Sequence, residues 1–447
     1  MFYFSENVKF SFNYFFINIC CDVCVCMDKS VVFAQIDCLR QEMVEALMSL
    51  ISVPAVAPEN GGEGELRKAE CLVRILEGVG FDKIERYDAP DVRVFGGLRP
   101  NVVAYFSGVS DVRRLWIVLH LDVVPSGNLD AWTVTAPFSP VLSGDYVFGR
   151  GSEDNGQPLV SSIFALKALK LLEIKPMFTV GLVFVSDEEQ GSRYGIEYLL
   201  KHHSHLFQPD DLVVVPDAGN ALGDFIEVAE KSMLWFKLCV MGRQVHGSRP
   251  DTGLNAHRIG MQVALALDEF LHEKYSAQNP LFDVPISTFE PTRKECNVEA
   301  INIIPGEDIT FFDCRILPKY DLNEVLADIQ NVLNYYEEKT GAKITLNILQ
   351  KNQSSTSPSS SFMFEADKAE VVLCLKAALK EARGIEASVG GVGGGTCGAF
   401  FRQIGIPVAV WCTLNDMAHQ PNEYAKISAM IDDAKVFALL AMGYNTL

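Results

Sequence analysis

Basic residues are scarce in this sequence relative to acidic ones. Lys and Arg together number 38 against 57 Asp and Glu, which gives a formal net charge of −19. Binding to nucleic acid or to an anionic membrane needs clustered Lys and Arg, because the phosphates must be neutralised. We therefore expect neither partner. The charge does not exclude an anionic substrate, since bound metal ions can reverse the local field.

A regular cysteine framework is also lacking. Of the 12 cysteines, four crowd between Cys20 and Cys26, and the others are scattered singly along the chain. A secreted disulfide scaffold would show a denser and more even pattern. The scatter favours a reducing compartment, and we expect a cytoplasmic protein.

The first 26 residues differ from the rest in being rich in Phe and Cys. Glu6 offsets Lys9 and polar residues interrupt the apolar run, so the segment suits neither a signal peptide nor a membrane span. No Cys or His pair follows at zinc-finger spacing. We interpret 1–26 as an extension without a folded role, with Met27 as the true start. A redox function of its cysteines is the alternative, and it would require this segment for activity.

With 447 residues the chain is long for one domain, and its pattern changes along its length. Between 115 and 217, apolar β-branched runs alternate with amphipathic helical stretches, which indicates a largely parallel sheet with helices on both faces. From 232 to 351 the predicted order is β-α-β-β-α-β, typical of a ferredoxin-like unit. The polar stretch 351–361 follows as a linker, and the helix–strand alternation then resumes.

The predicted fold class is therefore α/β, with a mixed, largely parallel sheet and an inserted smaller α+β domain. The larger domain would comprise 28–231 and 352–447, and the insertion 232–351. This division assigns each apolar pattern to a separate core.

Five potential metal ligands lie next to predicted strands or helices. His120 ends the run LWIVLH, Glu189 follows TVGLVFVS, Asp217 follows DLVVVP, His419 lies after IPVAVW, and Asp154 precedes a helix. The carboxyl ends of parallel strands meet at one edge of a sheet, where ligands bind. We expect the five side chains to converge there. Two imidazoles and three carboxylates suit two divalent ions, most naturally zinc, with cobalt or manganese as alternatives.

Neighbouring carboxylates have further predicted roles. Asp154 lies on a Gly-rich turn, central in the set, and could bridge two ions about 3.5–4 Å apart. Asp122 follows His120 by two residues on extended chain, so its carboxylate could accept the second imidazole N–H. Glu188 and Glu189 are adjacent and point in divergent directions. We assign Glu189 to a metal and Glu188 to the general base that takes a proton from metal-bound water.

Six segments occur in an order that is similar to a known family. They are HLD (120–122), FGRGSEDNGQ (148–157), SDEEQGSRYG (186–195), PDAG (216–219), VHGSRPDTGLNA (245–256) and AHQPNEY (418–424). From about residue 30 to the end, the chain resembles the dinuclear-zinc exopeptidases and deacylases, which include succinyl-diaminopimelate desuccinylase, acetylornithine deacetylase, glutamate carboxypeptidase and dipeptidases. The resemblance implies one ion held by His120, Asp154 and Asp217, and the other by Asp154, Glu189 and His419.

The resemblance also implies roles outside the metal set. His246 resembles a histidine that reaches the partner subunit's active site and stabilises the oxyanion, which implies a homodimer formed through an inserted lid domain. Asn302 and Arg315 resemble lid residues that grip the carboxylate of the substrate. A glycine loop resembles one that cradles the same end of the substrate, and its residues here are Gly394, Gly395 and Thr396.

Two departures weaken a desuccinylase assignment. Asp217 stands where the deacylases and carboxypeptidases often carry Glu, and Cys397 stands where desuccinylases often carry Ser.

We predict a metal-dependent hydrolase that cleaves an amide bond, peptide or N-acyl, in a small substrate with a free carboxylate. The alternatives are an N-acyl amino acid deacylase such as succinyl-diaminopimelate desuccinylase, and a non-catalytic binding protein on the same fold. A non-catalytic binding protein should have lost a metal ligand or the general base. Here all five metal-ligand positions and the position of the general base are filled.

Overall fold

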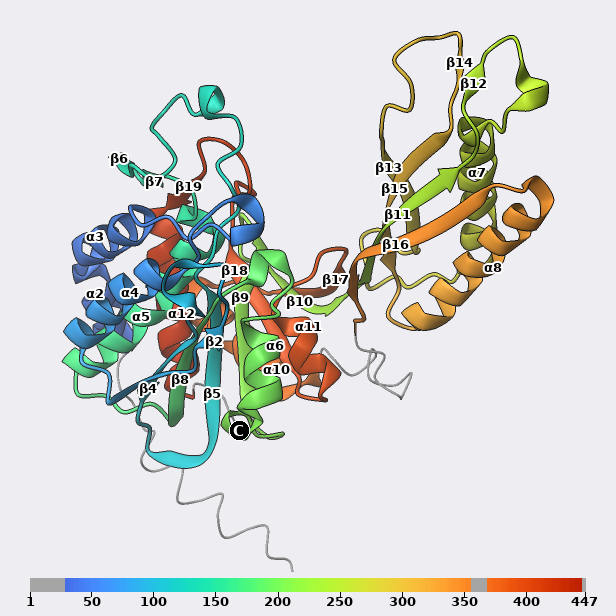
Figure 1. The fold of residues 1–447 in the computed structure, drawn as a ribbon. Coiled ribbons are helices and arrows are strands. Elements are labelled where there is room, and N and C mark those ends of the chain that lie inside the picture. The colour runs from blue at the N-terminus through green and yellow to red at the C-terminus, as the bar shows by residue number, and fades with distance from the viewer. Residues whose placement is uncertain (1–28, 355–367, 444–447) are drawn as a thin grey trace, which may run out of the picture.

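The chain folds into two bodies, each built on its own sheet (Figure 1). The structure is a computed structural model and describes residues 29–354 and 368–443. The predicted extension 1–26 and most of the predicted linker 351–361 lie outside the described residues. None of the helices in the described part of the chain is both long and apolar enough to cross a bilayer.

The larger body contains an eight-stranded sheet in the order β1-β4-β8-β5-β9-β18-β10-β17. The run β8-β5-β9-β18 is parallel, as is the pair β10 and β17, whereas the remaining neighbours are antiparallel. This confirms the predicted mixed, largely parallel sheet. The strands are β1 (Lys83–Arg86), β4 (Val102–Phe106), β5 (Ser110–His120), β8 (Phe178–Val185), β9 (Leu212–Asn220), β10 (Phe225–Glu230), β17 (Ser388–Val392) and β18 (Val408–Thr413).

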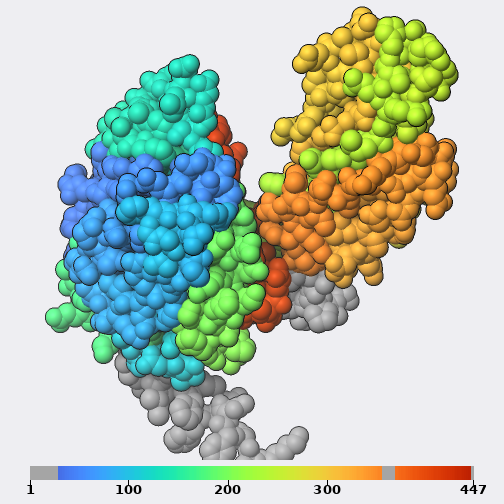
Figure 2. Space-filling view, viewed as in Figure 1, coloured from blue at the N-terminus to red at the C-terminus, as the bar shows by residue number. Residues whose placement is uncertain are grey.

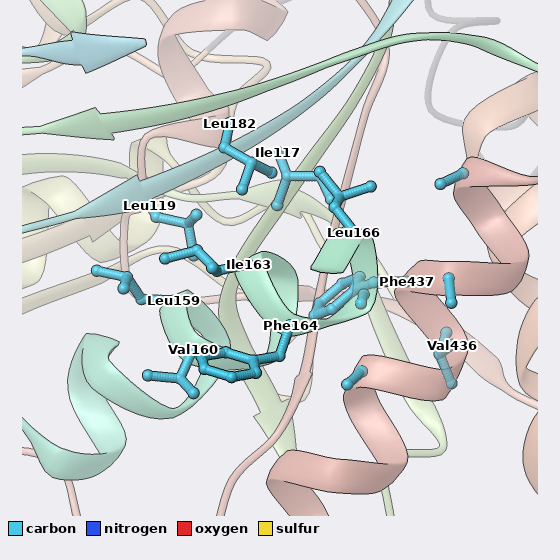
Figure 3. Close-up of a cluster of buried hydrophobic side chains, with 14 of the residues drawn as sticks. Ile117, Leu119, Leu159, Val160, Ile163, Phe164, Leu166, Leu182, Val436 and Phe437 are labelled. Carbon is cyan, nitrogen blue, oxygen red and sulfur yellow. The ribbon is translucent and has the colours of Figure 1, made fainter. Parts of the chain in front are cut away.

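Strand β5 shows why both faces of this sheet are buried. Leu115, Ile117 and Leu119 belong to the core on one face, and Trp116 and Val118 to the core on the other, as expected when successive side chains alternate. The first core packs mainly against α5 and α12 (Figure 3). Its helices are α2 (Lys29–Cys38), α3 (Arg40–Ile51), α4 (Leu66–Val79), α5 (Gln157–Leu171), α10 (Glu370–Arg383) and α12 (Ile427–Ala441); the second face carries α6 (Ile196–His202) and α11 (Gly398–Gln403).

The smaller body is a four-stranded antiparallel sheet in the order β13-β15-β11-β16. Two helices cover one of its faces, and Phe236 stacks on Phe312 in the core between them, with ring centroids 4.7 Å apart. The chain order is the predicted β-α-β-β-α-β. The elements are β11 (Ser232–Met241), α7 (Ala256–Lys274), β13 (Thr288–Lys294), β15 (Glu307–Ile316), α8 (Leu322–Thr340) and β16 (Lys343–Asn352).

Short pairings complete the described structure. The pair β12 (Val245–His246) and β14 (Ile303–Ile304) forms the end of the smaller body that is farthest from the larger one (Figure 1). An open gap separates the two bodies and narrows toward their junction (Figure 2). The other short strands belong to the larger body: β2 (Ala89–Pro90), β3 (Leu98–Arg99), β6 (Val141–Ser143), β7 (Tyr146–Phe148) and β19 (Tyr424–Lys426).

Some predicted boundaries differ from the structure. The helical pattern from Val32 to Ile51 is divided between α2 and α3. Asp217 lies inside β9 and not after it, because β9 stays paired with β18 as far as Asn220. Strand β16 reaches Asn352, two residues into the predicted linker, because Lys351 and Asn352 still pair with β11.

A buried cluster of charged side chains lies where β10 leads into β11. Arg402 Nη1 is 3.1 Å from Glu227 Oε1 and 3.1 Å from Glu230 Oε1, and all three residues are buried. Burial, together with the charge of Glu230, raises the pKa of Glu227 well above its ordinary value. Folding therefore shifts Glu227 toward the protonated form relative to its state in water.

The variant Glu227→Gln tests this assignment. We expect its free energy of unfolding at neutral pH to stay within about 1 kcal/mol of the wild type, because the amide has the shape of a protonated carboxyl. A raised folded-state pKa gives stability that is present at lower pH and lost as the pH rises through that pKa. The wild type should therefore lose stability relative to the variant toward alkaline pH. Urea unfolding over a pH series measures this, and parallel curves for the two proteins would contradict it.

Candidate metal centre

The structure brings the five predicted ligands together at the carboxyl ends of the parallel strands. His120 Nε2 lies 2.8 Å from Asp154 Oδ1 and 3.3 Å from Asp217 Oδ1. His419 Nε2 lies 3.2 Å from Asp154 Oδ2 and 3.1 Å from Glu189 Oε2. Asp154 is therefore shared between the two imidazoles, one oxygen to each.

Five different segments deliver these side chains. His120 is the last residue of β5, and Asp217 lies in β9, the neighbouring parallel strand. Glu189 lies in a short 3-10 turn that follows β8, and Asp154 lies in the turn that precedes α5. His419 lies in the loop between β18 and β19, where its φ of 65° places it in the left-handed region. Convergence at this edge follows from the parallel strand order.

Glu188 lies beside the same cluster. Ligand atoms of His120, Glu188 and Asp217 all lie within 4.8 Å of one another, and so do those of His120, Asp154 and Glu189. Glu188 thus shares the neighbourhood of His120 with Asp217, while Glu189 faces His419. The adjacent glutamates diverge, as expected from their sequence.

The electrostatics of this cluster favour bound cations. Burial opposes a charge on His120, but Asp217 and the other nearby carboxylates outweigh it and raise its pKa well above the ordinary value. Hydrogen bonds to Asp154 and Glu189 raise the pKa of His419 to about 10. Burial and the charge of Asp154 raise the pKa of Glu189 to about 7. These shifts show how closely the carboxylates surround both imidazoles.

The donor set fits divalent metal ions. It consists of imidazole nitrogens and carboxylate oxygens, which suit zinc and similar ions. His120 Nδ1 is engaged with the backbone carbonyl of Asp122 at 3.0 Å, which leaves Nε2 directed at the carboxylates. An orienting contact of this kind is typical of histidine ligands.

The carboxylate of Asp122 has a different main contact from the one predicted. Its oxygen Oδ1 is 3.6 Å from His120 Nδ1, and the shorter contact of that nitrogen is with the Asp122 carbonyl. The two carboxylate oxygens instead accept the backbone N–H groups of Glu188 and Glu189, each at 3.0 Å. Asp122 therefore connects the end of β5 to the turn that carries both glutamates.

A buried arginine contacts the residue that precedes the same turn. Arg99 is fully buried, and its Nη2 donates to Asp187 Oδ1 at 3.0 Å, while Nε donates to Glu65 Oε2 at 2.7 Å. Asp187 also accepts the N–H of Tyr194. Asp187 immediately precedes Glu188, so this network fixes the start of the turn.

Two buried glutamates hold the loops that carry Asp154 and His419. Glu423 accepts the backbone N–H groups of Gly151, Glu153 and Asp154 and pairs with Arg150 at 2.7 Å. Glu153 in turn accepts the backbone N–H of Met417 at 2.6 Å. Each loop thus contributes a carboxylate that holds the other loop.

Sequence reasoning missed these supporting residues. Glu153 and Glu423 lie inside the quoted motifs, and a second acid near each proposed ligand was the available signal. Asn155, also in a motif, donates from Nδ2 to Asp217 Oδ1 at 2.7 Å. For Arg99 and Glu65 the sequence offered no signal, because neither lies in a recognised motif.

The remaining predicted site residues fall into two groups. Arg315 donates from Nη1 to the carbonyl of Gly393 at 3.1 Å, so it lies beside the loop that contains Gly394 and Gly395. Thr396 in that loop is buried and donates to Glu230 Oε1 at 2.7 Å. Its hydroxyl is therefore engaged inside the protein.

His246 and Asn302 lie elsewhere, at the β12–β14 end of the smaller body (Figure 1). His246 is exposed and its Nδ1 contacts Ser248 Oγ at 2.8 Å, while the carbonyl of Asn302 accepts the N–H of Gly247. Within one chain the structure does not bring Asn302 to Arg315, although both were expected to grip one carboxylate.

Comparison with known proteins agrees with this geometry. Residues 116–443 match the sequence profile of peptidase family M20/M25/M40. An uncharacterized metallohydrolase of Methanocaldococcus jannaschii is 39% identical over 413 residues, which cover 89% of this chain and 98% of the relative. A succinyl-diaminopimelate desuccinylase of Azoarcus is 26% identical over 394 residues, covering 87% of this chain and 94% of that protein.

Solved structures share the fold. The dipeptidase Dug1p of Saccharomyces cerevisiae superposes with a TM-score of 0.73 at 20% identity, covering 93% of this chain and 98% of its own. The metallo-carboxypeptidase Sso-CP2 of Sulfolobus solfataricus gives a TM-score of 0.71 at 20% identity, covering 91% and 100%. The site and fold define a metal-dependent hydrolase of the peptidase and amidohydrolase class. The chain belongs to peptidase family M20/M25/M40.

The variant Glu423→Gln tests whether Glu423 holds the loop that carries Asp154. The amide cannot pair with Arg150 as a carboxylate does, so we expect the loop carrying Asp154 to loosen and metal affinity to fall on the order of tenfold. Stability should also fall, by up to about 3–5 kcal/mol, because a buried charge loses its partner. Metal titration and urea unfolding measure both effects.

The matched control is Glu370→Gln, which removes a Glu–Arg pair with Arg113 at the protein surface. This variant should change stability by less than about 1 kcal/mol and leave metal affinity unchanged. Equal metal affinity in the Glu423 and Glu370 variants would contradict a supporting role for Glu423.

Proposed function

We propose that this protein hydrolyses an amide bond, peptide or N-acyl, in a small substrate that carries a free carboxylate. The observation that carries the proposal is the cluster of two imidazoles and three carboxylates at the edge of the large sheet, with Glu188 beside His120 and Asp217. Relatives named as a dipeptidase, a carboxypeptidase and a desuccinylase all cleave bonds of this chemical kind.

Two divalent ions would occupy the cluster. The contacts support one ion between His120, Asp154 and Asp217, and a second between Asp154, Glu189 and His419. Zinc suits this donor set best, with cobalt or manganese as alternatives. When bound, the ions would polarise the scissile carbonyl and lower the pKa of a water molecule.

Glu188 is the proposed general base. Its carboxylate takes a proton from the attacking water as the new C–O bond forms, and returns it to the amine nitrogen as the C–N bond breaks. The N–H contact between Glu188 and Asp122 fixes the position of the base relative to His120. Asp122 therefore acts by positioning both groups.

The substrate's carboxylate would be held at the junction of the two bodies. Arg315 and the loop of Gly394 and Gly395 supply the donors, because a guanidinium offers paired N–H groups and glycines allow close backbone approach. We propose that 232–351 forms the lid over a catalytic domain made of 28–231 and 352–447. The open gap between the two bodies supports this division (Figure 2).

An N-acyl amino acid deacylase is the second candidate, and the similarity to a succinyl-diaminopimelate desuccinylase favours it. Dipeptides and N-acyl amino acids assayed side by side would separate the two activities.

We also propose a cytoplasmic location, which is supported by the eight free cysteines in the described part of the chain. A non-catalytic binding protein would bind the substrate without turnover.

The variant Glu188→Ala tests the mechanism. We expect turnover to fall by on the order of 10²–10⁴-fold, because the proton relay is lost. Metal content should stay at about two ions per chain, since neither proposed ion depends on Glu188. Initial rates with metal-reconstituted protein, together with elemental analysis, measure both. Glu338→Ala, on the exposed side of α8, is the control, and full activity of the Glu188 variant would refute the assignment.

We also propose a homodimer through the lid. His246 lies at the far end of the smaller body and needs a second chain to reach a catalytic cluster (Figure 1). Met261 and Leu265 lie one turn apart on α7 and are 46% and 65% exposed, which offers an apolar contact surface. Sedimentation should give twice the chain mass for the wild type and the chain mass for Leu265→Glu. A monomeric wild type at assay concentration would contradict the dimer.

A further inference from the structure

One face of the small sheet carries a charged pair that bridges the two bodies. Leu234, Phe236 and Cys314 point into the core beneath α7 and α8. The residues that alternate with them, including Asp313 and Arg315, therefore lie on the opposite face. That face turns toward the gap between the bodies (Figure 1).

Asp313 holds the guanidinium of Arg315 in a fixed plane. Arg315 Nε donates to Asp313 Oδ1 at 2.6 Å and Nη2 donates to Oδ2 at 3.0 Å, while Nη1 donates to the Gly393 carbonyl at 3.1 Å. The ring of Trp235 lies 5.6 Å from the guanidinium carbon. A guanidinium has five N–H groups. These three bonds leave one N–H free on each terminal nitrogen.

The surroundings leave space for a ligand at this point. A Cβ added to Gly393 or Gly394 would meet no atom within 4 Å, so the space above the loop is open. The indole N–H of Trp235, which is directly opposite Asp313 in the sheet, is buried and has no hydrogen-bond partner among the described residues. The open space at Gly393, whose carbonyl contacts Arg315 Nη1, leaves room for an acceptor that a substrate brings to the guanidinium.

Stability alone does not account for the Asp313–Arg315 pair. The two side chains are 30% and 27% exposed, and partly exposed ion pairs contribute little to the free energy of folding. The pair instead sets the direction of the two free N–H groups. It also ties the small sheet to the loop of the larger body through Gly393.

We propose that Asp313 is a positioning residue that presents Arg315 to the carboxylate of the substrate and so determines the preference for free acids. The inference rests on the proposed function, because it concerns the carboxylate that the hydrolysed substrate carries. A carboxylate bound across the two terminal nitrogens of Arg315 would meet a planar donor pair that is already oriented. Loss of the Asp313 charge frees the side chain to rotate.

The test compares a free-acid substrate with its carboxamide in the wild type, in Asp313→Asn and in a control. For Asp313→Asn we expect KM for the free acid to rise on the order of tenfold with kcat within about twofold, because a misoriented guanidinium weakens binding and leaves the chemistry intact. kcat/KM for the carboxamide should not change. The ratio of the two kcat/KM values therefore falls about tenfold.

The control is Asp88→Asn. Asp88 pairs with Arg86 through the same two nitrogens, Nε and Nη2, in the larger body. This variant should keep the wild-type ratio.

Three results would overturn the inference. A proportional loss with both substrates would show a merely structural role. A lower KM for the free acid would show that Asp313 competes with the substrate for Arg315. An unchanged ratio would show that neither free N–H meets the carboxylate. Failure of the wild type to hydrolyse either substrate would instead refute the proposed function.

Discussion

The repulsion between carboxylates gathered at one edge of the large sheet is the constraint on which the structure of the site depends. The parallel strands deliver Asp217 and, through the turn after β8, Glu188 and Glu189 to one small volume, and the turn before α5 adds Asp154. Like charges at this distance disfavour one another, and each imidazole contacts two carboxylates. Backbone N–H groups stabilise Asp122 beside the cluster, and the donor set suits divalent cations.

The supporting contacts form a second layer around the cluster. Asp122, Glu153 and Glu423 each accept backbone N–H groups from segments that carry or flank the ligands. Buried arginines then neutralise part of this layer, with Arg150 against Glu423 and Arg99 against Asp187. Because each contact joins two segments, the ligand positions depend on loops holding one another and not on the strands alone.

Within one chain, the smaller body meets the larger one at a junction beside the glycine loop. Strand β10 continues into β11 beside the buried Glu227, Glu230 and Arg402 cluster, and Thr396 joins that cluster from the glycine loop. Arg315 contacts the same loop at the Gly393 carbonyl. The distance between Arg315 and the candidate metal centre is therefore set by how the two sheets meet.

The sequence by itself determined the two sheets and the set of candidate metal ligands that converge, because apolar periodicity defines strands and helices locally and strand ends predict where polar side chains meet. His120, Asp217 and His419 were recognisable in this way. Only the tertiary structure decided which atoms touch: that Asp122 accepts N–H groups from the glutamate turn, that Arg99 lies beneath Asp187, and that Asn302 lies far from Arg315. Such contacts join segments distant in sequence, and no local pattern records the direction of a side chain across them.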